Sequence, residues 1–197
     1  QLTVYDKHFQ TPAWAKGAVM YQIFPDRFCR SDYYMPQHAK NERKIHENWS
    51  DVPDFIYDHP DYKGNDFFCG NLKGIMERIE YLASLGVDVI YLNPIFESPE
   101  NHRYSTADYT KVDPYLGTND DFQALCDRCN QAGIRVVLDG VFSHTGADSI
   151  YFNKYGHFDS IGAWQGKASP YYNWYEFDDS AIGYRCWWGF DTLPNVN

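Results

Sequence analysis

Three short runs of apolar residues are spaced along the chain, and each predicts a buried β-strand. They span residues 18–24 (AVMYQIF), 87–92 (VDVIYL) and 134–141 (IRVVLDGV). Pro25 ends the first run, and a glycine stands directly before each of the other two. Nearly continuous apolar runs of this kind are typical of strands that are covered on both faces of a sheet.

Between these runs, two amphipathic patterns predict helices over residues 71–85 and 118–132. Asn71 and Thr118 are residue types that cap helix N-termini, and Gly86 and Gly133 stand where a left-handed C-terminal cap is expected. The apolar positions follow helical spacing; they are Leu72, Ile75, Ile79, Leu82 and Leu85 in the first helix and Phe122, Leu125, Cys126 and Cys129 in the second.

The order strand, helix, strand, helix, strand predicts an α/β fold with parallel strands, because each return to a parallel neighbour needs a crossover. The pattern fits both a closed barrel and an open doubly wound sheet. A Rossmann-like sheet lacks only its glycine-rich phosphate loop here. The periodicity therefore leaves the two architectures open.

The remaining segments lack such patterns. Residues 1–17 are polar and form a lead-in segment, and residues 29–68 form a long irregular excursion of the length that often carries function. Residues 143–197 are aromatic and irregular. We interpret them as a separate lobe inserted after the third strand.

Aromatic residues make up 18% of the chain, with 17 Tyr, 13 Phe and 6 Trp. Rings with a polar edge suit surfaces that are apolar on one side and wet on the other, as sugars are, so either carbohydrate binding or a tyrosine-rich core would account for them. The net charge of −10 argues against a nucleic-acid partner, since such proteins usually present a basic face.

Five cysteines occur without the regular spacing of a disulfide framework. Cys126 and Cys129 form a C-x-x-C inside a predicted helix, which favours buried apolar roles over metal or redox chemistry. No apolar run is long enough to cross a membrane, and the start of the chain is not a signal peptide. Reduced cysteines favour a bacterial cytoplasmic location.

Several motifs, met in chain order, resemble glycoside hydrolase family 13, the α-amylase family, and most closely its neopullulanase and cyclomaltodextrinase branch. They are YQIFPDRF at 21–28, GNLKGI at 70–75, YLNPIF at 91–96, HRYSTADY at 102–109, DGVFSH at 139–144 and LPNVN at 193–197. Together they extend over most of the chain, which makes the resemblance stronger than any single motif.

The resemblance implies a partial (β/α)8 TIM barrel, comprising its first three strand–helix units, with an irregular inserted domain after the third strand. Residues 18–142 would form this first part of the catalytic barrel and residues 143–197 the inserted domain B. A complete barrel needs about 250 residues. In the family, the catalytic nucleophile and proton donor follow later strands, beyond Asn197, so we expect the isolated chain to be inactive.

By the same resemblance, four residues correspond to substrate-binding or supporting positions. Tyr104 matches a tyrosine that stacks on the sugar ring, and His144 matches a histidine that hydrogen-bonds sugar hydroxyls. Asp139 matches an aspartate that supports the loops around the nucleophile. His102, together with Arg103, is expected to shape the rim of the site.

Calcium is a further expectation of the resemblance, although no cofactor is required for the reaction. The candidate ligands are Asp32 and Asn71, but two departures weaken the case. Asn71 replaces an aspartate of the family, and Ser143 replaces an asparagine that is a calcium ligand in many members. Calcium prefers several oxygen ligands that include carboxylates.

The implied function of the parent protein is hydrolysis, with retention, of α-glucosidic bonds in maltodextrins, cyclodextrins or pullulan. An α-glucan would be the partner, and the parent could be a homodimer; no nucleic acid or membrane is expected. One alternative is a non-catalytic family relative used for carbohydrate binding or as a scaffold. Another, an all-β carbohydrate-binding module, is disfavoured by the two helices.

Overall fold

The computed structural model describes residues 3–31, 43–54 and 64–197. Its centre is a sheet of three parallel strands, β1 (Met20–Ile23), β4 (Val89–Leu92) and β7 (Arg135–Leu138), in the order β1-β4-β7. Because Ile23, Leu92 and Leu138 are paired across the sheet, the carboxyl ends of all three strands lie at one edge. This arrangement confirms the predicted parallel α/β pattern.

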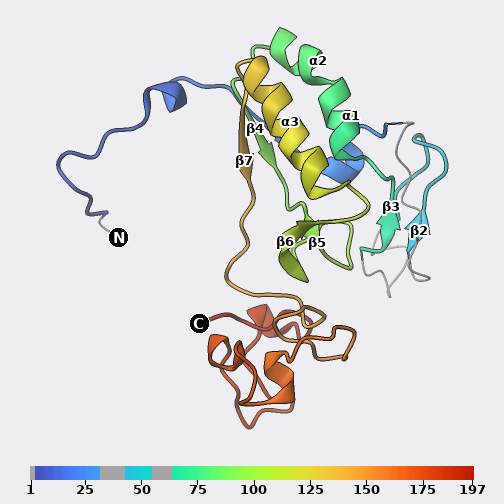
Figure 1. The fold of residues 1–197 in the computed structure, drawn as a ribbon, viewed down its shortest axis with the longest axis vertical. Coiled ribbons are helices and arrows are strands. Elements are labelled where there is room, and N and C mark those ends of the chain that lie inside the picture. Colours follow the sequence, from blue (N-terminus) through green and yellow to red (C-terminus); the bar gives the residue numbers. More distant parts are fainter. Residues whose placement is uncertain (1–2, 32–42, 55–63) are drawn as a thin grey trace.

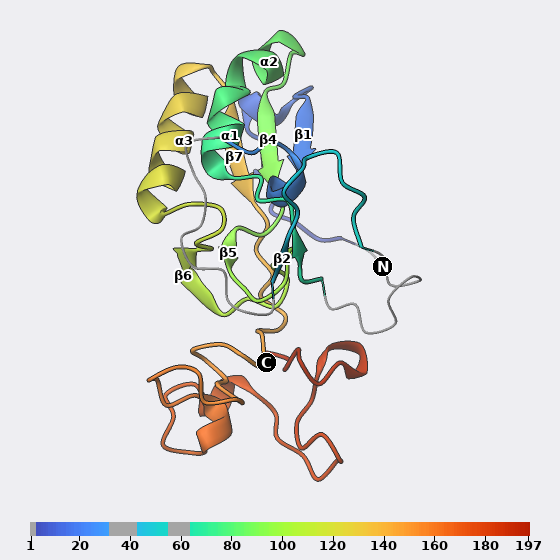
Figure 2. The ribbon, with the colours of Figure 1, turned by 90° about the vertical axis from the view of Figure 1, so that its right-hand side faces the viewer.

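Helices α1 (Leu72–Glu77), α2 (Ile79–Ser84) and α3 (Asn119–Gln131) cover one face of the sheet (Figures 1 and 2). The Asn71 side chain caps α1 by accepting a hydrogen bond from the Gly74 amide at 2.8 Å. Thr118 and Asp121 form a capping box at the start of α3. Both caps therefore begin their helices where the sequence predicted.

The predicted helix 71–85 is divided at Arg78, whose φ of −105° and ψ of 6° leave helical geometry. The Arg78 Nε donates to the Sγ of Cys29 at 3.4 Å. The apolar face remains continuous across this break, since Ile75 and Ile79 are fully buried. Leu85 is the exception: it is 49% exposed, because it lies past the end of α2, where the chain turns away from the core.

The third strand is shorter than predicted. It ends at Leu138, after which the Asp139 amide still donates to the carbonyl oxygen of Leu92 at 3.0 Å. Residues 140–142 then leave the sheet toward the lobe (Figure 1). The carboxyl end of β7 is thus where the sheet and the lobe are joined.

Two small sheets flank the carboxyl edge of the central sheet. Strands β2 (Lys44–Ile45) and β3 (Asp66–Phe67) pair in parallel, and β5 (Phe96–Glu97) and β6 (Asp108–Val112) pair antiparallel. The second pair lies between the central sheet and the lobe (Figure 1). The β5–β6 connection, residues 98–107, therefore reaches the region where the two parts of the molecule meet.

Residues 143–197 form a lobe with short 3-10 helices at Ala163–Gln165, Tyr172–Trp174 and Trp187–Gly189. The lobe has its own buried cluster, distinct from the cluster between the sheet and the helices; it comprises Ala147, Tyr151, Phe152, Ala163, Tyr175 and Tyr184. Two further single-turn elements are Ala13–Ala15, in the lead-in, and Pro25–Arg27. Among the described residues, no helix combines the length and apolar character that a membrane crossing needs.

Candidate active-site cleft

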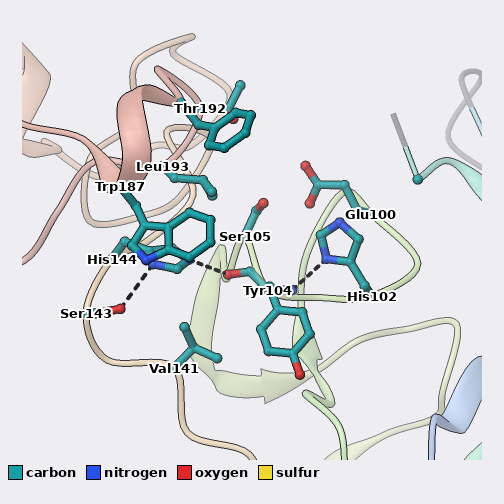
Figure 3. A pocket seen from close by; sticks show the side chains of 12 residues that line it. Glu100, His102, Tyr104, Ser105, Val141, Ser143, His144, Trp187, Thr192 and Leu193 are labelled. Atoms are coloured by element: carbon teal, nitrogen blue, oxygen red, sulfur yellow. Dashed lines mark hydrogen bonds between the residues drawn. The ribbon is translucent and has the colours of Figure 1, made fainter. Parts of the chain in front are cut away.

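A cavity of about 880 Å³ opens between the carboxyl edge of the sheet and the lobe (Figure 3). Four parts of the chain line it: Gly64 before β3, the β5–β6 connection, the chain that follows β7, and the end of the lobe. The lining residues are Gly64, Glu100, His102, Tyr104, Ser105, Val141, Ser143, His144, Trp187, Phe190, Thr192 and Leu193. Three of the four residues expected at the site therefore face one cavity.

Tyr104 connects the β5–β6 connection to the chain that follows β7. Its hydroxyl donates to Oδ2 of Asp139 at 2.9 Å, and its carbonyl oxygen lies 3.1 Å from Nε2 of His144. Asp139, which does not line the cavity, thus reaches the site through Tyr104. Burial is the main cause that raises the pKa of Tyr104, to about 12, and Asp139 adds to it. The phenol therefore stays protonated as the donor.

His144 is held in one tautomer by its neighbours. A carbonyl oxygen can only accept, so Nε2 carries the proton that is donated to Tyr104. Nδ1 is then free to accept from the Ser143 hydroxyl, which lies 3.2 Å away. Burial lowers the pKa of His144, partly offset by the bond to the Tyr104 carbonyl, and this favours a neutral ring.

The chain that carries His144 is anchored by Tyr109, a residue that the sequence did not single out for the site. Its hydroxyl lies against the carbonyl oxygens of Val141 and His144, the latter at 3.0 Å. Burial raises the pKa of Tyr109 to about 12, so this anchor remains protonated. Tyr109 belongs to β6 and therefore ties the small sheet to the segment after β7.

His102 accepts a hydrogen bond at Nδ1 from the Tyr104 amide, at 3.1 Å, and its ring centroid lies 5.8 Å from that of Tyr104. Burial, followed by the positive charge of Arg103, lowers the pKa of His102 to about 4. A neutral His102 therefore lines the cavity. Burial also raises the pKa of Glu100 beside it.

Arg103 does not lie at the rim, contrary to the expectation from sequence. It is fully buried with a φ of 61°, and its guanidinium donates to the Asn101 carbonyl at 2.7 Å and pairs with Asp113 at 3.4 Å. The left-handed backbone turns this side chain inward between two residues that face the cavity. Arg103 thus lies inside the protein between two residues that line the cavity.

A smaller cavity of about 390 Å³ adjoins the site and is lined by Gln22, Phe24, Asn93 and His102. Gln22 donates to the Asn93 Oδ1 at 2.8 Å, and the Asn93 amide donates to the Tyr104 hydroxyl at 3.4 Å. Both amides were missed in the sequence. Their position at the carboxyl ends of β1 and β4, where ligands of parallel sheets bind, is the signal that could have identified them.

The family described as "Alpha amylase, catalytic domain" matches residues 22–190, which include every element of the cavity except its last residues. The chain belongs to the α-amylase family. The predicted resemblance is therefore confirmed.

Two curated relatives illustrate the similarity of this chain to other members of the family. It is 51% identical over 215 residues to an amylopullulanase of Thermoanaerobacterium thermosulfurigenes, with 100% of the chain and 11% of the relative covered. It is 35% identical over 185 residues to neopullulanase 2 of Thermoactinomyces vulgaris, with 94% and 28% covered. The chain therefore spans only a minor part of the curated relatives that it matches.

Two solved structures of glycoside hydrolases share the fold of this chain. Cyclic α-maltosyl-(1→6)-maltose hydrolase from Arthrobacter globiformis, in complex with cyclic α-maltosyl-(1→6)-maltose, superposes with a TM-score of 0.76 at 33% identity, covering 96% of this chain and 39% of that one. The type III pullulan hydrolase from Thermococcus kodakarensis gives 0.76 at 32% identity, covering 93% and 33%.

Of the two candidate calcium ligands of this α-amylase-family chain, only Asn71 is among the described residues. Asp32 lies outside the described residues. Both polar atoms of the Asn71 side chain have protein partners: Oδ1 accepts from Gly74, and Nδ2 donates to the Cys69 carbonyl at 3.2 Å. The side chain is fully buried, which is suited to capping α1 but not to an ion that takes six to eight oxygens.

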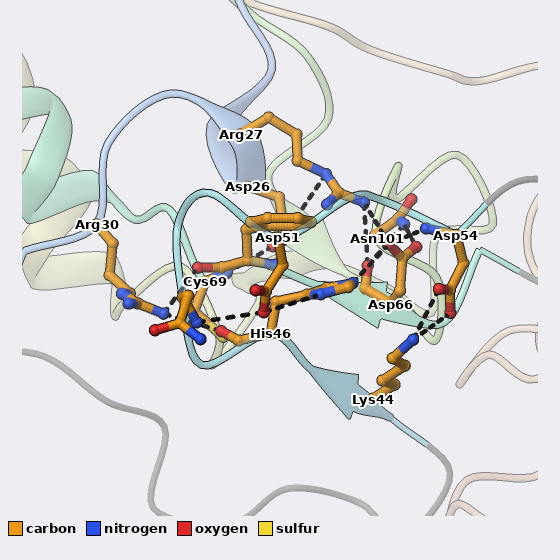
Figure 4. Close-up of polar contacts among 12 residues, drawn as sticks. Asp26, Arg27, Arg30, Lys44, His46, Asp51, Asp54, Asp66, Cys69 and Asn101 are labelled. Atoms are coloured by element: carbon orange, nitrogen blue, oxygen red, sulfur yellow. Dashed lines mark hydrogen bonds and ion pairs between the residues drawn. The ribbon is translucent and has the colours of Figure 1, made fainter.

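A second polar cluster surrounds Asp66 in the excursion between β1 and α1 (Figure 4). His46, Asp54 and Asp66 bring ligand atoms within 4.8 Å of one another, the spacing of a metal site. Cationic groups already occupy this cluster, however, since Arg27 lies 3.2 Å from Asp66 and Lys44 lies 2.7 Å from Asp54. The described part of this cluster is an ion-pair network that joins the strands β2 and β3 to Arg27, which follows β1.

The aromatic residues of the lobe divide into two groups. Trp174 stacks on Tyr151 of the lobe core at 5.4 Å, and Tyr172 stacks on Phe177 at 4.8 Å. Trp187, by contrast, lines the cavity with its ring centroid 5.5 Å from that of His144. Some of these rings therefore pack within the lobe, whereas Trp187 lines the cavity.

Proposed function

We propose that the protein to which this chain belongs is a retaining hydrolase of α-glucosidic bonds in maltodextrins, cyclodextrins or pullulan. The observation that carries this proposal is the hydrogen-bonded group of Tyr104, Asp139 and His144 at the cavity. These residues join an aromatic face to polar groups that hydrogen bonds hold in place. Such a combination suits a sugar ring, whose faces are apolar and whose rim carries hydroxyls.

Within this site, Tyr104 offers its ring to the sugar while Asp139 holds its hydroxyl in place. His144 can accept from a sugar hydroxyl at Nδ1 where that hydroxyl replaces Ser143, whose own hydroxyl is then free for the sugar. Neutral His102 shapes the rim. Because the rings of both histidines are neutral, the site suits an uncharged substrate. None of these residues is assigned the bond-breaking step.

Retaining hydrolysis needs two carboxyl groups about 5 Å apart, one as nucleophile and one as proton donor. We propose that these groups follow later strands of a complete (β/α)8 barrel, of which β1, β4 and β7 with their helices are the first three units. The 197-residue chain alone is then inactive. The partial exposure of β1 and β7 is consistent with further strands at both edges of the sheet.

We further propose that activity requires no metal, because the Asn71 side chain is engaged in capping. We also propose, from the sequence, that the whole protein forms a homodimer and is located in the cytoplasm. Sedimentation of the whole protein and fractionation of producing cells test these two directly.

Reducing-sugar release from γ-cyclodextrin and pullulan tests the main proposal. The 197-residue chain is compared with the whole protein. Release only by the whole protein supports a hydrolase whose carboxylates lie outside this chain. Silence of both, with maltotriose still bound, would instead establish a non-catalytic relative and reject the proposal. Activity of the short chain that disappears in Asp139→Ala would reject the assignment of Asp139 to support.

A further inference from the structure

The bend between β7 and the lobe, at residues 141–144, is held by a side chain from another strand. The hydroxyl of Tyr109, in β6, lies against the carbonyl oxygens of Val141 and His144, which are 32 and 35 positions away along the chain. Among the described residues, no backbone amide donates to either of these two carbonyls. Because both carbonyl oxygens converge on one phenol, the hydrogen bonding of this bend depends on Tyr109.

Tyr109 itself is held from several sides. Its ring centroid lies 5.7 Å from that of Phe96 in β5, 5.5 Å from that of Phe142 in the bend, and 5.6 Å from that of Tyr151 in the lobe core. Its backbone amide donates to the Tyr151 hydroxyl at 3.1 Å. The phenol therefore has a fixed place between the small sheet, the bend and the lobe.

The same part of the chain holds both the ring and the backbone of His144. The ring donates from Nε2 to the Tyr104 carbonyl oxygen at 3.1 Å, and the carbonyl oxygen of His144 lies 3.0 Å from the Tyr109 hydroxyl. Two residues further on, the Gly146 amide donates to the Thr106 carbonyl oxygen at 2.9 Å. Residues 104–109 thus determine where the bend places the imidazole.

We propose that Tyr109 is a positioning residue for hydrolysis, whose hydroxyl fixes the backbone of His144 so that the imidazole stays beside Tyr104 at the cavity. The proposal rests on the proposed function, in which His144 contacts a sugar hydroxyl. Tyr109 does not line the cavity, so its effect on the reaction has to pass through His144. A small displacement of a substrate-contacting group lowers the rate steeply, because the reaction depends on the position of the bound substrate.

The test is a double-mutant cycle in the whole protein with Tyr109→Phe and His144→Ala. Phenylalanine keeps the ring contacts and removes only the hydroxyl. We expect kcat/KM for the better hydrolysed of γ-cyclodextrin and pullulan to fall about tenfold, the order of one lost hydrogen bond. In the His144→Ala background the same change should leave kcat/KM unaltered, because the imidazole that Tyr109 positions is already gone.

The melting temperature supplies the readout for the structural part of the role. The carbonyl at position 144 is present in both backgrounds, so Tyr109→Phe should lower the melting temperature by the same amount in each. Ser169→Ala is the matched control, since it removes a buried hydroxyl that donates to the Ile161 carbonyl of the lobe at 2.7 Å, and neither residue lines the cavity. It should lower the melting temperature without changing kcat/KM.

Equal losses of kcat/KM in the two backgrounds would show a general structural effect and overturn the proposal. No loss, or failure of Tyr109→Phe to fold, would also overturn it. If the unchanged protein hydrolyses neither glucan, the proposed function fails, and calorimetric binding of maltotriose replaces the rate in the same cycle. Weaker binding that depends on His144 would then support the positioning role, and unchanged binding would reject it.

Discussion

The low pKa of His102 makes a specific prediction about stability in acid. Its pKa is lowered from 6.5 to about 4 in the folded chain by burial and by Arg103. Well above pH 6.5 the His102 ring is neutral in both the folded and the unfolded chain and does not affect stability. As the pH falls below 6.5, the unfolded chain binds the proton more tightly than the folded chain does. The folded state therefore loses stability until the pH reaches about 4, the pKa in the folded chain.

The size of the effect follows from the same two pKa values. Between about pH 7.5 and pH 5, the folded state should lose about 2 kcal/mol through this one residue, at about 1.4 kcal/mol per pKa unit. For a domain of this size, that loss corresponds to a fall of about 4–8 °C in melting temperature.

His102→Asn is the matched variant, because its side-chain oxygen can still accept from the Tyr104 amide but does not titrate. Thermal unfolding of both proteins at the two pH values gives the difference that belongs to His102. His144, whose pKa is also lowered, contributes equally to both and cancels. If the variant loses as much stability in acid as the unchanged chain, the buried neutral state of His102 is refuted.

Three further predictions concern the same region. Tyr104→Phe removes the donor to Asp139 and should lower the free energy of unfolding by about 1–2 kcal/mol in urea titrations, while Tyr104→Ala should in addition raise KM for maltodextrins. Gly74→Ala places a Cβ 2.1 Å from the Cys29 carbonyl oxygen and should lower the free energy of unfolding by about 3 kcal/mol or more. This loss should appear as a large drop in melting temperature. Lys73→Ala on the same helix is the control and should not produce such a drop. EDTA should change neither activity nor melting temperature, because Asn71 caps α1; a loss that calcium restores would contradict this.

The main elements of the fold could be predicted because they depend on local signals. Apolar runs, the Asn71 and Thr118 caps and the glycines after the helices each act over a few residues. The break at Arg78 could not be predicted, because the apolar spacing continues through it. The strands β5 and β6 were also missed: β5 has only two residues, and β6 (DYTKV) is largely polar, so neither has a strand pattern that stands out.

The site was predictable to the extent that motifs identify it. The motifs located Tyr104, His144 and Asp139, but not the hydrogen bond that joins Tyr104 to Asp139 across 35 positions. Gln22 and Asn93 were missed because an amide at a strand end has no distinctive spacing. These contacts are tertiary, and only the parallel register of the three strands brings them together.

Backbone strain links the parts of the site that the sequence could not reveal. Arg103 and Trp188 both have positive φ values, 61° and 50°, although neither is a glycine. In the first case the strain directs a buried cation inward so that His102 and Tyr104 face the cavity; in the second it holds an indole in solvent. Each conformation costs about 1–3 kcal/mol and must be stabilised by its surroundings. The ion pair of Arg103 with Asp113 provides this at one wall of the cavity, and the backbone hydrogen bonds from Trp187 and Phe190 provide it at the other. Each of these two residues is next in sequence to residues that line the cavity, His102 and Tyr104 in the first case and Trp187 in the second.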